Sequence, residues 1–306
     1  MTEPQAPRID LISGLLLLAL GMVWGGSFFF AKIALSEVPP LTVALHRVFW
    51  AVPVLFLVVL WKGLVIPRSI RAWLCYFVMG ALNNAIPFSL IFWGQTHIGS
   101  GLASILNSTT AFFGVIVAGI FLADERLTIK KTVGALCGVL GVATIMGIEA
   151  LVHFSLQNLA QLAILGAALF YAFAGVWGRL FLREYPPIMN AFGMLVASTV
   201  LMFPVAIVSE GLPVLALSKG VWASIIAVAV LSTAVAYLLY FRILAIAGSA
   251  NLMLVTLLIP PIGVGLSVAF LGEEMGAGAS LGFVLIVIGL IITDGRVIER
   301  FRRQSV

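Results

Sequence analysis

The sequence predicts an all-helical integral membrane protein in which ten transmembrane helices form two inverted-topology repeats of five helices each. Three observations support this fold class. The chain is 62% apolar and only 9% charged, whereas soluble domains are about 45–50% apolar and about 25% charged. The apolar residues form long stretches separated by short connections, and the second half of the chain repeats motifs of the first.

Ten apolar stretches are long enough to cross a bilayer, for which a helix needs about 20 mainly apolar residues. The first is too long for a signal peptide and has no obvious cleavage site, so we expect it to stay in the mature protein. The ten expected spans are 11–35, 41–61, 72–95, 99–122, 129–148, 158–182, 187–208, 220–245, 249–271 and 277–293.

The positive charges predict the orientation of the chain, because Lys and Arg concentrate in cytoplasmic loops. With the N-terminus inside, the cytoplasmic side holds the basic residues of 62–71, 126–131, 179–183 and 296–303. We therefore expect cytoplasmic N- and C-termini. The net charge of +5 reflects these loops and requires no nucleic-acid partner. The two cysteines have no metal-ligand spacing, so no metal or cofactor is expected.

Internal repetition gives the domain organisation. The turn "SEVPP" at 36–40 returns as "REYPP" at 183–187, and residues 101–127 match residues 250–276 in position. These matches divide the chain into repeats 1–148 and 149–306. Because each half has an odd number of spans, the second copy enters the membrane from the opposite side. Inverted repeats are typical of secondary transporters, since two near-equal halves can exchange conformations.

Several stretches carry a family resemblance: "GMVWGGSFFFAKIAL", "PPLTVALHRVFWA" and "ASILNSTTAFFGVIVAGIFLADERLTIKKTVGALCGVLGV". They resemble the EamA-like branch of the drug/metabolite transporter superfamily. The resemblance implies a ten-helix bundle that carries small metabolites, most often outward. We expect a multi-pass protein of a bacterial inner membrane. Relatives often have a proline after the "NSTT"-like run, where this chain has Ala111 and its second half has Pro260. That difference predicts a less kinked fourth span, a more kinked ninth span and unequal half-gates.

Polar and aromatic residues recur at one depth in both halves, where they are costly unless they face a cavity or a partner. The four pairs across the repeat are Trp24 with Tyr171, Asn83 with Ser232, Asn84 with Thr233, and Asn107 with Thr256. We expect them to line a central substrate cavity between the halves. Further candidates for its wall are Ser27, Phe28, Phe88, Thr110 and Tyr237. For each residue alone, helix packing or interhelical hydrogen bonding is the alternative.

The dipeptide His46-Arg47 lies about two turns into the second span, and its repeat counterpart is Gly193-Met194. A buried charge costs roughly 2.5–3.5 kcal/mol on insertion scales, so Arg47 must face water or a partner. Arg47 either binds a substrate carboxylate or anchors helix-end carbonyls, and its position near the outer surface favours the anchor. Lys32, near the end of the first span, is expected to snorkel to the interface.

The twelve Asp and Glu residues all lie in tails, connections or last turns of spans. Glu125 and Glu274 precede the fifth and tenth spans. We expect their negative charges either to stabilise the helix N-termini there or to contact a gate. With no carboxylate at mid-membrane, we expect a facilitator, an exchanger or a carrier coupled through His46. An aromatic and amide cavity suits neutral or zwitterionic solutes such as amino acids. The alternatives are a small-solute channel and a carrier of quaternary ammonium compounds.

An enzyme is not expected, because the chain has no HExxH or P-loop motif. Glycines at spacing four, Gly134 with Gly138 and Gly278 with Gly282, put small residues on the fifth and tenth spans. Such spacing lets helices approach closely. Packing within the chain and a homodimer through these two helices both remain open.

Overall fold

A computed structural model describes residues 11–123, 128–146, 155–252 and 254–294, and the regular elements in these ranges are all helical. The first half contains α1 (Leu11–Ala34), α2 (Pro40–Trp61), α3 (Ile70–Gly80), η1 (Ala81–Ala85), α4 (Ile86–His97), α5 (Ser100–Asn107), α6 (Thr110–Phe121) and α7 (Ile129–Met146). The second half contains α9 (Leu156–Phe181), α10 (Pro187–Glu210), α11 (Lys219–Ile226), η2 (Ala227–Val235), α12 (Ala236–Leu252), α13 (Val255–Leu271) and α14 (Ala277–Asp294).

The predicted fold class is confirmed. Eight continuous helical stretches are long and apolar enough to cross a membrane, and the two shorter apolar helices 255–271 and 277–293 complete the ten. The third predicted span consists of α3, η1 and α4, the fourth of α5 and α6, and the eighth of α11, η2 and most of α12. The repeat boundary near residue 148 lies outside the described residues.

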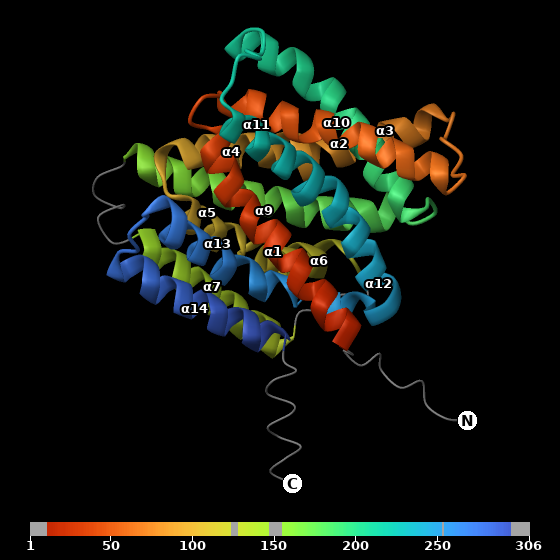
Figure 1. Ribbon diagram of the computed structural model, residues 1–306. Helices are drawn as coiled ribbons and strands as arrows, with labels where there is room; N and C mark the ends of the chain where they lie inside the picture. Colours follow the sequence, from red (N-terminus) through yellow and green to blue (C-terminus); the bar gives the residue numbers. More distant parts are fainter. Residues whose placement is uncertain (1–10, 124–127, 147–154, 253, 295–306) are drawn as a thin grey trace, which may run out of the picture.

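The helix contacts show the inverted repeat directly. Helix α1 packs on α13 as α9 packs on α5 and α6, and α2 contacts η2 as α10 contacts η1 and α3. The pairs α2–α10, α5–α13 and α7–α14 each join equivalent helices of the two halves. In Figure 1 the start of α1 and the end of α14 lie on the same side of the bundle. The two halves therefore interlock around a pseudo-two-fold axis.

Both halves contain a π-helical segment at the same place in the repeat. Segment η1 lies in the third span and η2 in the eighth, and the repeat aligns residues 81–85 with residues 230–234 inside η2. A π-helical turn holds an extra residue and changes where the following side chains point. The predicted cavity residues Asn83, Asn84, Ser232 and Thr233 all lie in these two segments.

The fourth span, which was expected to be the less kinked one, consists of two helices joined by a short turn. Helix α5 ends at Asn107 and α6 begins at Thr110. Between them the amides of Ser108 and Thr109 each donate to the carbonyl three residues back, at 3.1 Å. Their hydroxyls donate to the same carbonyls at 2.6 Å. A run of hydroxyl residues therefore tightens this turn without a proline.

The ninth span contains two prolines inside one helix. Helix α13 continues through Pro260 and Pro261, and the kink expected at Pro260 stays a prediction. Gly248, with φ +77°, breaks the helical path inside α12, at the junction between the eighth and ninth spans. A glycine adopts this left-handed backbone at little cost.

Three carboxylates join the two halves at one end of the bundle by accepting backbone N–H groups at helix N-termini. These carboxylate caps are Glu37 with Ser218 (2.8 Å), Glu210 with Leu41 (2.9 Å) and Thr42 (2.8 Å), and Glu273 with Ser100 (2.7 Å) and Gly101 (3.0 Å). Each carboxylate accepts hydrogen bonds from backbone amides that have no partner within the helix. Its negative charge also interacts favourably with the positive end of the helix dipole. Hydrogen bonds from Ser218 lower the pKa of the Glu37 carboxyl. This cap therefore holds above the ordinary glutamate pKa and is lost as the pH falls through the lowered value.

The opposite end of the bundle lacks the matching contact. The repeat pairs Glu37 with Glu184 and Ser218 with Ser69, but Glu184 is exposed and makes no bond to Ser69 within the described ranges. A pocket of about 400 Å³ lies there instead. It is lined by Arg71, Cys75, Leu180, Phe181, Arg183, Glu184 and Tyr185. The carboxylate caps therefore occur at one end, while at the other end the halves meet through different contacts, such as the hydrogen bond from Trp177 Nε1 to the Cys75 carbonyl at 3.1 Å.

Two charged residues have roles other than those predicted. Lys32 does not snorkel: its Nζ donates to the carbonyls of Gln95 (2.6 Å) and Ile98 (3.1 Å) at the end of α4. A lysine at this place donates hydrogen bonds to the last carbonyls of the helix, and its charge interacts favourably with the negative end of the helix dipole. Glu274 is exposed, whereas its neighbour Glu273 makes the cap. Glu125 lies outside the described residues.

The glycines of α7 and α14 are used for packing inside the chain. These helices lie side by side at the lower edge of Figure 1. A Cβ on Gly141 would lie 2.7 Å from Ile286 Cγ1 and 2.8 Å from the Gly282 carbonyl oxygen. A Cβ on Gly134 would lie 2.6 Å from the Gly289 carbonyl oxygen. The backbones approach so closely that only glycine fits.

Gly141→Leu is expected to lower the free energy of unfolding by roughly 2–3 kcal/mol, the usual cost of overpacking a close contact. Gly265→Leu is the matched control, because Gly265 also lies in a helix but has open space around its Cβ position. Thermal unfolding in detergent measures both. An equal loss of stability in the two variants would contradict the packing described here.

Candidate substrate site

Polar and aromatic side chains of both halves meet where η1, η2, α2, α4, α9 and α12 come together. Seven of the residues predicted to line the cavity belong to this group, together with Arg47. We call this group the central cluster: Arg47, Asn83, Asn84, Phe88, Tyr171, Ser232, Thr233 and Tyr237.

Two asparagines of η1 connect to the second half. Asn83 Nδ2 donates to the hydroxyl of Tyr237 at 3.0 Å, and that hydroxyl lies 3.5 Å from Asn84 Oδ1. Asn84 is fully buried and donates to Ser198 Oγ at 3.0 Å. Ser198 in turn donates to the carbonyl of Met194 at 2.5 Å. The amides are thus held in fixed orientations between η1, α10 and α12.

The guanidinium of Arg47 lies against η2 and an aromatic ring. Its Nε donates to Thr233 Oγ1 at 3.0 Å and its Nη2 lies 3.4 Å from the Ser232 carbonyl oxygen. Its Cζ is 3.9 Å from the centroid of the Phe88 ring, a cation–π distance. Arg47 is 8% exposed, and Tyr171 and Tyr237 are among its neighbours. The packing of α2 on η2 therefore places Arg47 in the central cluster.

The first helix contributes its backbone to this region. Ser232 Oγ donates to the carbonyl of Val23 at 2.8 Å, which ties η2 to α1. The neighbouring Trp24 ring lies 5.9 Å from the ring of Tyr240, in a separate apolar group with Leu17 and Leu20. Trp24 therefore has its ring contacts outside the central cluster.

Two other predicted residues of α1 also have contacts elsewhere. Ser27 Oγ donates to the carbonyl of Trp24 at 2.7 Å, within its own helix. Phe28 is buried, and its carbonyl accepts a hydrogen bond from Gln95 Nε2 at 2.9 Å. These contacts are those of packing and helix-to-helix bonding.

The fourth and ninth spans carry the last predicted pair. Thr110 Oγ1 donates to the carbonyl of Asn107 at 2.7 Å. The side-chain oxygen of Asn107 is buried and has no hydrogen-bond partner in the described part of the chain. Its counterpart Thr256 is half-buried in α13. An unpaired buried acceptor costs about 1–3 kcal/mol, so Asn107 is suited to receive a donor from a ligand.

His46 points away from the central cluster. Its Nδ1 accepts a hydrogen bond from Trp50 Nε1 at 3.1 Å, and its ring lies 5.8 Å from that of Trp222. In a neutral imidazole this places the proton on Nε2. That nitrogen is buried and has no polar partner among the residues described. A proton path through His46 therefore has no visible next member in these ranges.

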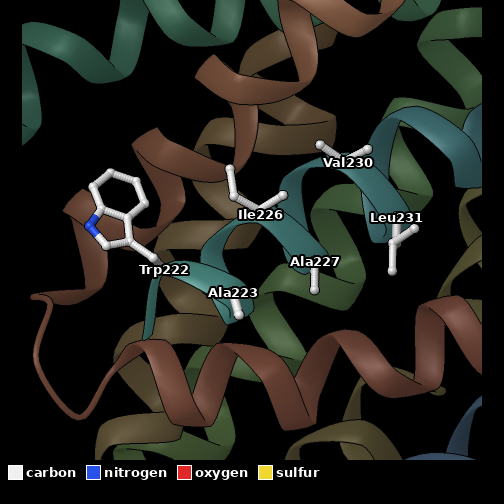
Figure 2. Close-up of a pocket in the computed structure, with 6 residues that line it drawn as sticks. All are labelled: Trp222, Ala223, Ile226, Ala227, Val230 and Leu231. Atoms are coloured by element: carbon white, nitrogen blue, oxygen red, sulfur yellow. The ribbon is translucent and has the colours of Figure 1, made fainter. Parts of the chain in front are cut away.

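Another pocket lies along α11 and η2, on the outside of the bundle. Figure 2 shows its lining: Trp222, Ala223, Ile226, Ala227, Val230 and Leu231. The indole nitrogen of Trp222 donates to the carbonyl of Leu215 at 3.2 Å. Ile226 is 41% and Leu231 45% exposed. This apolar surface suits lipid tails and offers nothing to hold a polar solute.

Sequence reasoning missed Ser198 and Met194 beside the cluster, and Gln95 near the end of α4. Ser198 and Met194 of α10 support the asparagines of η1. Gln95 is fully buried, with its side-chain oxygen unpaired in the described ranges. The sequence did point to Met194, because the repeat aligns it with Arg47. Gln95 was visible as an isolated amide near the end of a span.

Two inverted five-helix repeats that enclose a polar cluster define the class of membrane transporters built by internal duplication. The sequence profile of the EamA-like transporter family matches residues 11–147 and 158–293. The chain belongs to this family and is a multi-pass membrane protein.

Relatives over nearly the full length carry transporter names. The uncharacterized transporter YoaV of Bacillus subtilis is 24% identical over 90% of this chain and 94% of its own. A probable amino-acid metabolite efflux pump of Escherichia coli is 27% identical over 91% of this chain and 93% of its own. One solved crystal structure, at 18% identity, has a TM-score of 0.67 and covers 92% of this chain and 96% of its own. That likeness supports the fold alone.

Proposed function

We propose that the chain is a secondary carrier that exports small neutral or zwitterionic metabolites, foremost amino acids, by alternating access around the central cluster. One observation carries this proposal. The two π-helical segments occupy equivalent places in the two halves and present polar side chains to one shared site. The relative named as a probable amino-acid metabolite efflux pump supports the same solute class.

The chemistry of the cluster favours zwitterions over cations. It offers amide and phenol groups and one guanidinium, and no carboxylate of the described chain belongs to it. The guanidinium already occupies one face of Phe88 at 3.9 Å. A quaternary ammonium ion would meet this fixed positive charge, which disfavours that alternative. The chain acts as a facilitator or exchanger and performs no covalent chemistry.

The orientation belongs to the same proposal. Both termini face the cytoplasm of a bacterium, with the protein in the inner membrane. The carboxylate caps then lie on the outer side and the pocket at Glu184 on the inner side. The caps then hold this conformation closed on its outer side. A homodimer would use the outward faces of α7 and α14, where Leu136 and Leu281 are exposed, because their glycine faces are already paired.

Asn83→Ala is expected to lower the transport efficiency of the reconstituted protein about 10-fold, because it removes the bond to Tyr237 and an amide of the site. The measurement is exchange of labelled aliphatic, aromatic and hydroxylated amino acids in liposomes. Ser89→Ala is the matched control: Ser89 lies in the same span, and its hydroxyl donates to the carbonyl of Ala85 (2.7 Å), within its own helix.

Unchanged exchange by Asn83→Ala would remove the central cluster as the binding site. Equal losses in Asn83→Ala and Ser89→Ala would indicate a general effect on folding.

A further inference from the structure

Arg47 carries a buried charge that the described chain does not neutralise. It lies seven residues beyond the start of α2, about 10 Å into the span at 1.5 Å per residue. No carboxylate in the described ranges pairs with it, and its titratable neighbours are the phenols of Tyr171 and Tyr237, which are neutral at pH 7. Buried charges are ordinarily paired. An unpaired arginine at this depth is therefore suited to an anionic group from outside the chain.

The side chain is held in place with donors to spare. A guanidinium has five N–H donors in a planar fork. One bonds to Thr233 Oγ1 and another lies near the Ser232 carbonyl, at 3.0 and 3.4 Å. Phe88 covers one face of the plane. The remaining donors have no acceptor within the described residues, and the fork geometry matches a carboxylate.

The repeat itself tests whether Arg47 is only an anchor for η2. Its counterpart Met194 lies against η1, with its sulfur 3.8 Å from Asn83 Nδ2. The two residues therefore hold equivalent positions against equivalent π-helical segments. The thioether of Met194 packs against η1, whereas the cation of Arg47 packs against η2. Holding a π-helical segment thus does not require a charge, and the positive charge at 47 needs another reason.

We infer that Arg47 binds the carboxylate of the transported solute, and that the solute class is therefore restricted to molecules with a carboxylate. The inference deepens the proposed function and rests on it. The rest of the cluster suits the other end of a zwitterion. Phenol and amide oxygens can accept bonds from an ammonium group, and the aromatic faces attract it.

The test compares labelled L-leucine with labelled L-leucinamide in exchange by the reconstituted full chain, with empty liposomes as background. At about pH 6.5 both α-amino groups are mainly protonated, so the two solutes differ chiefly in the carboxylate. The wild-type protein is expected to prefer L-leucine about 10-fold or more, the ratio lost with a charge-assisted hydrogen bond.

Two variants separate binding from anchoring. Arg47→Met copies the residue at the equivalent position and is expected to abolish the preference while keeping the thermal unfolding midpoint near that of the wild type. Arg47→Lys keeps the charge without the fork and is expected to retain part of the preference. If Arg47→Met lowers the midpoint strongly and reduces both solutes equally, Arg47 is an anchor and the inference is overturned.

Failure of the proposed substrate class is distinguishable from failure of this inference. If the wild type exchanges no amino acid, that class is wrong, and thermal stabilisation by butyrate against butyramide then tests Arg47 alone. A shift with butyrate that disappears in Arg47→Met supports carboxylate binding. The absence of any shift with butyrate in the wild type would refute it.

Discussion

A short reversible crosslink between residues 37 and 218 is expected to stop transport, and its cleavage to restore it. Glu37 and Ser218 belong to different halves and form one of the carboxylate caps. If solutes pass by alternating access, these residues must separate once in every cycle. The variant carries Glu37→Cys and Ser218→Cys in a chain whose native cysteines are replaced by Cys75→Ala and Cys137→Ala. The measured quantity is amino-acid exchange before and after crosslinking.

The controls for this experiment come from the repeat. Single-cysteine variants treated with the same reagent report chemical damage. The equivalent pair, Glu184→Cys with Ser69→Cys, lies at the end where the contact is not made and is expected to crosslink more slowly. Once linked, it should also stop transport. Exchange at the unmodified rate through a fully linked 37–218 variant would show that this end of the bundle does not move.

Glu273→Gln is expected to shift the conformational balance away from the arrangement described here by about 5- to 30-fold. Both carboxylate oxygens of Glu273 accept backbone N–H groups of α5, and Lys32 lies near its charge. The glutamine keeps one acceptor and loses the charge, at a cost of about 1–2 kcal/mol. The crosslinking rate of the 37–218 pair should fall and that of the 69–184 pair should rise.

Glu274→Gln is the control for this variant. Glu274 is exposed and has no partner in the described part of the chain, so its neutralisation should leave both rates unchanged. Equal changes in the two variants would assign the effect to net charge and not to the cap on α5.

The fold was predictable because span length and repetition are written into the sequence. Ten apolar stretches and a duplicated turn are enough for the inverted repeat. The π-helical segments were not predictable, because a stretch such as 227–235 is compatible with an ordinary helix by composition. The turn at Ser108 was not predicted, because a proline is the usual sign of a break in a helix and here hydroxyl groups bond the carbonyls.

The site was partly predictable. Pairing residues across the repeat identified Asn83 and Thr233, which the structure brings to one cluster. Trp24 was identified by the same pairing with Tyr171, yet its ring packs against Tyr240 outside the central cluster. Counting turns along α2 estimates the depth of Arg47 but not its neighbours, which depend on how α2 packs against η2. The partners of Glu37, Glu210 and Glu273 lie in the other half, so no local pattern reveals them.

Counterflow by the wild-type chain tests the central claim, a carrier with one site exposed to each side in turn, most directly. Liposomes that contain the protein are loaded with an unlabelled amino acid and offered a trace of the labelled form outside. A carrier predicts transient, saturable accumulation of label above the outside concentration. Equilibration without accumulation, at a rate that rises linearly with concentration, would be the behaviour of a channel and would contradict alternating access.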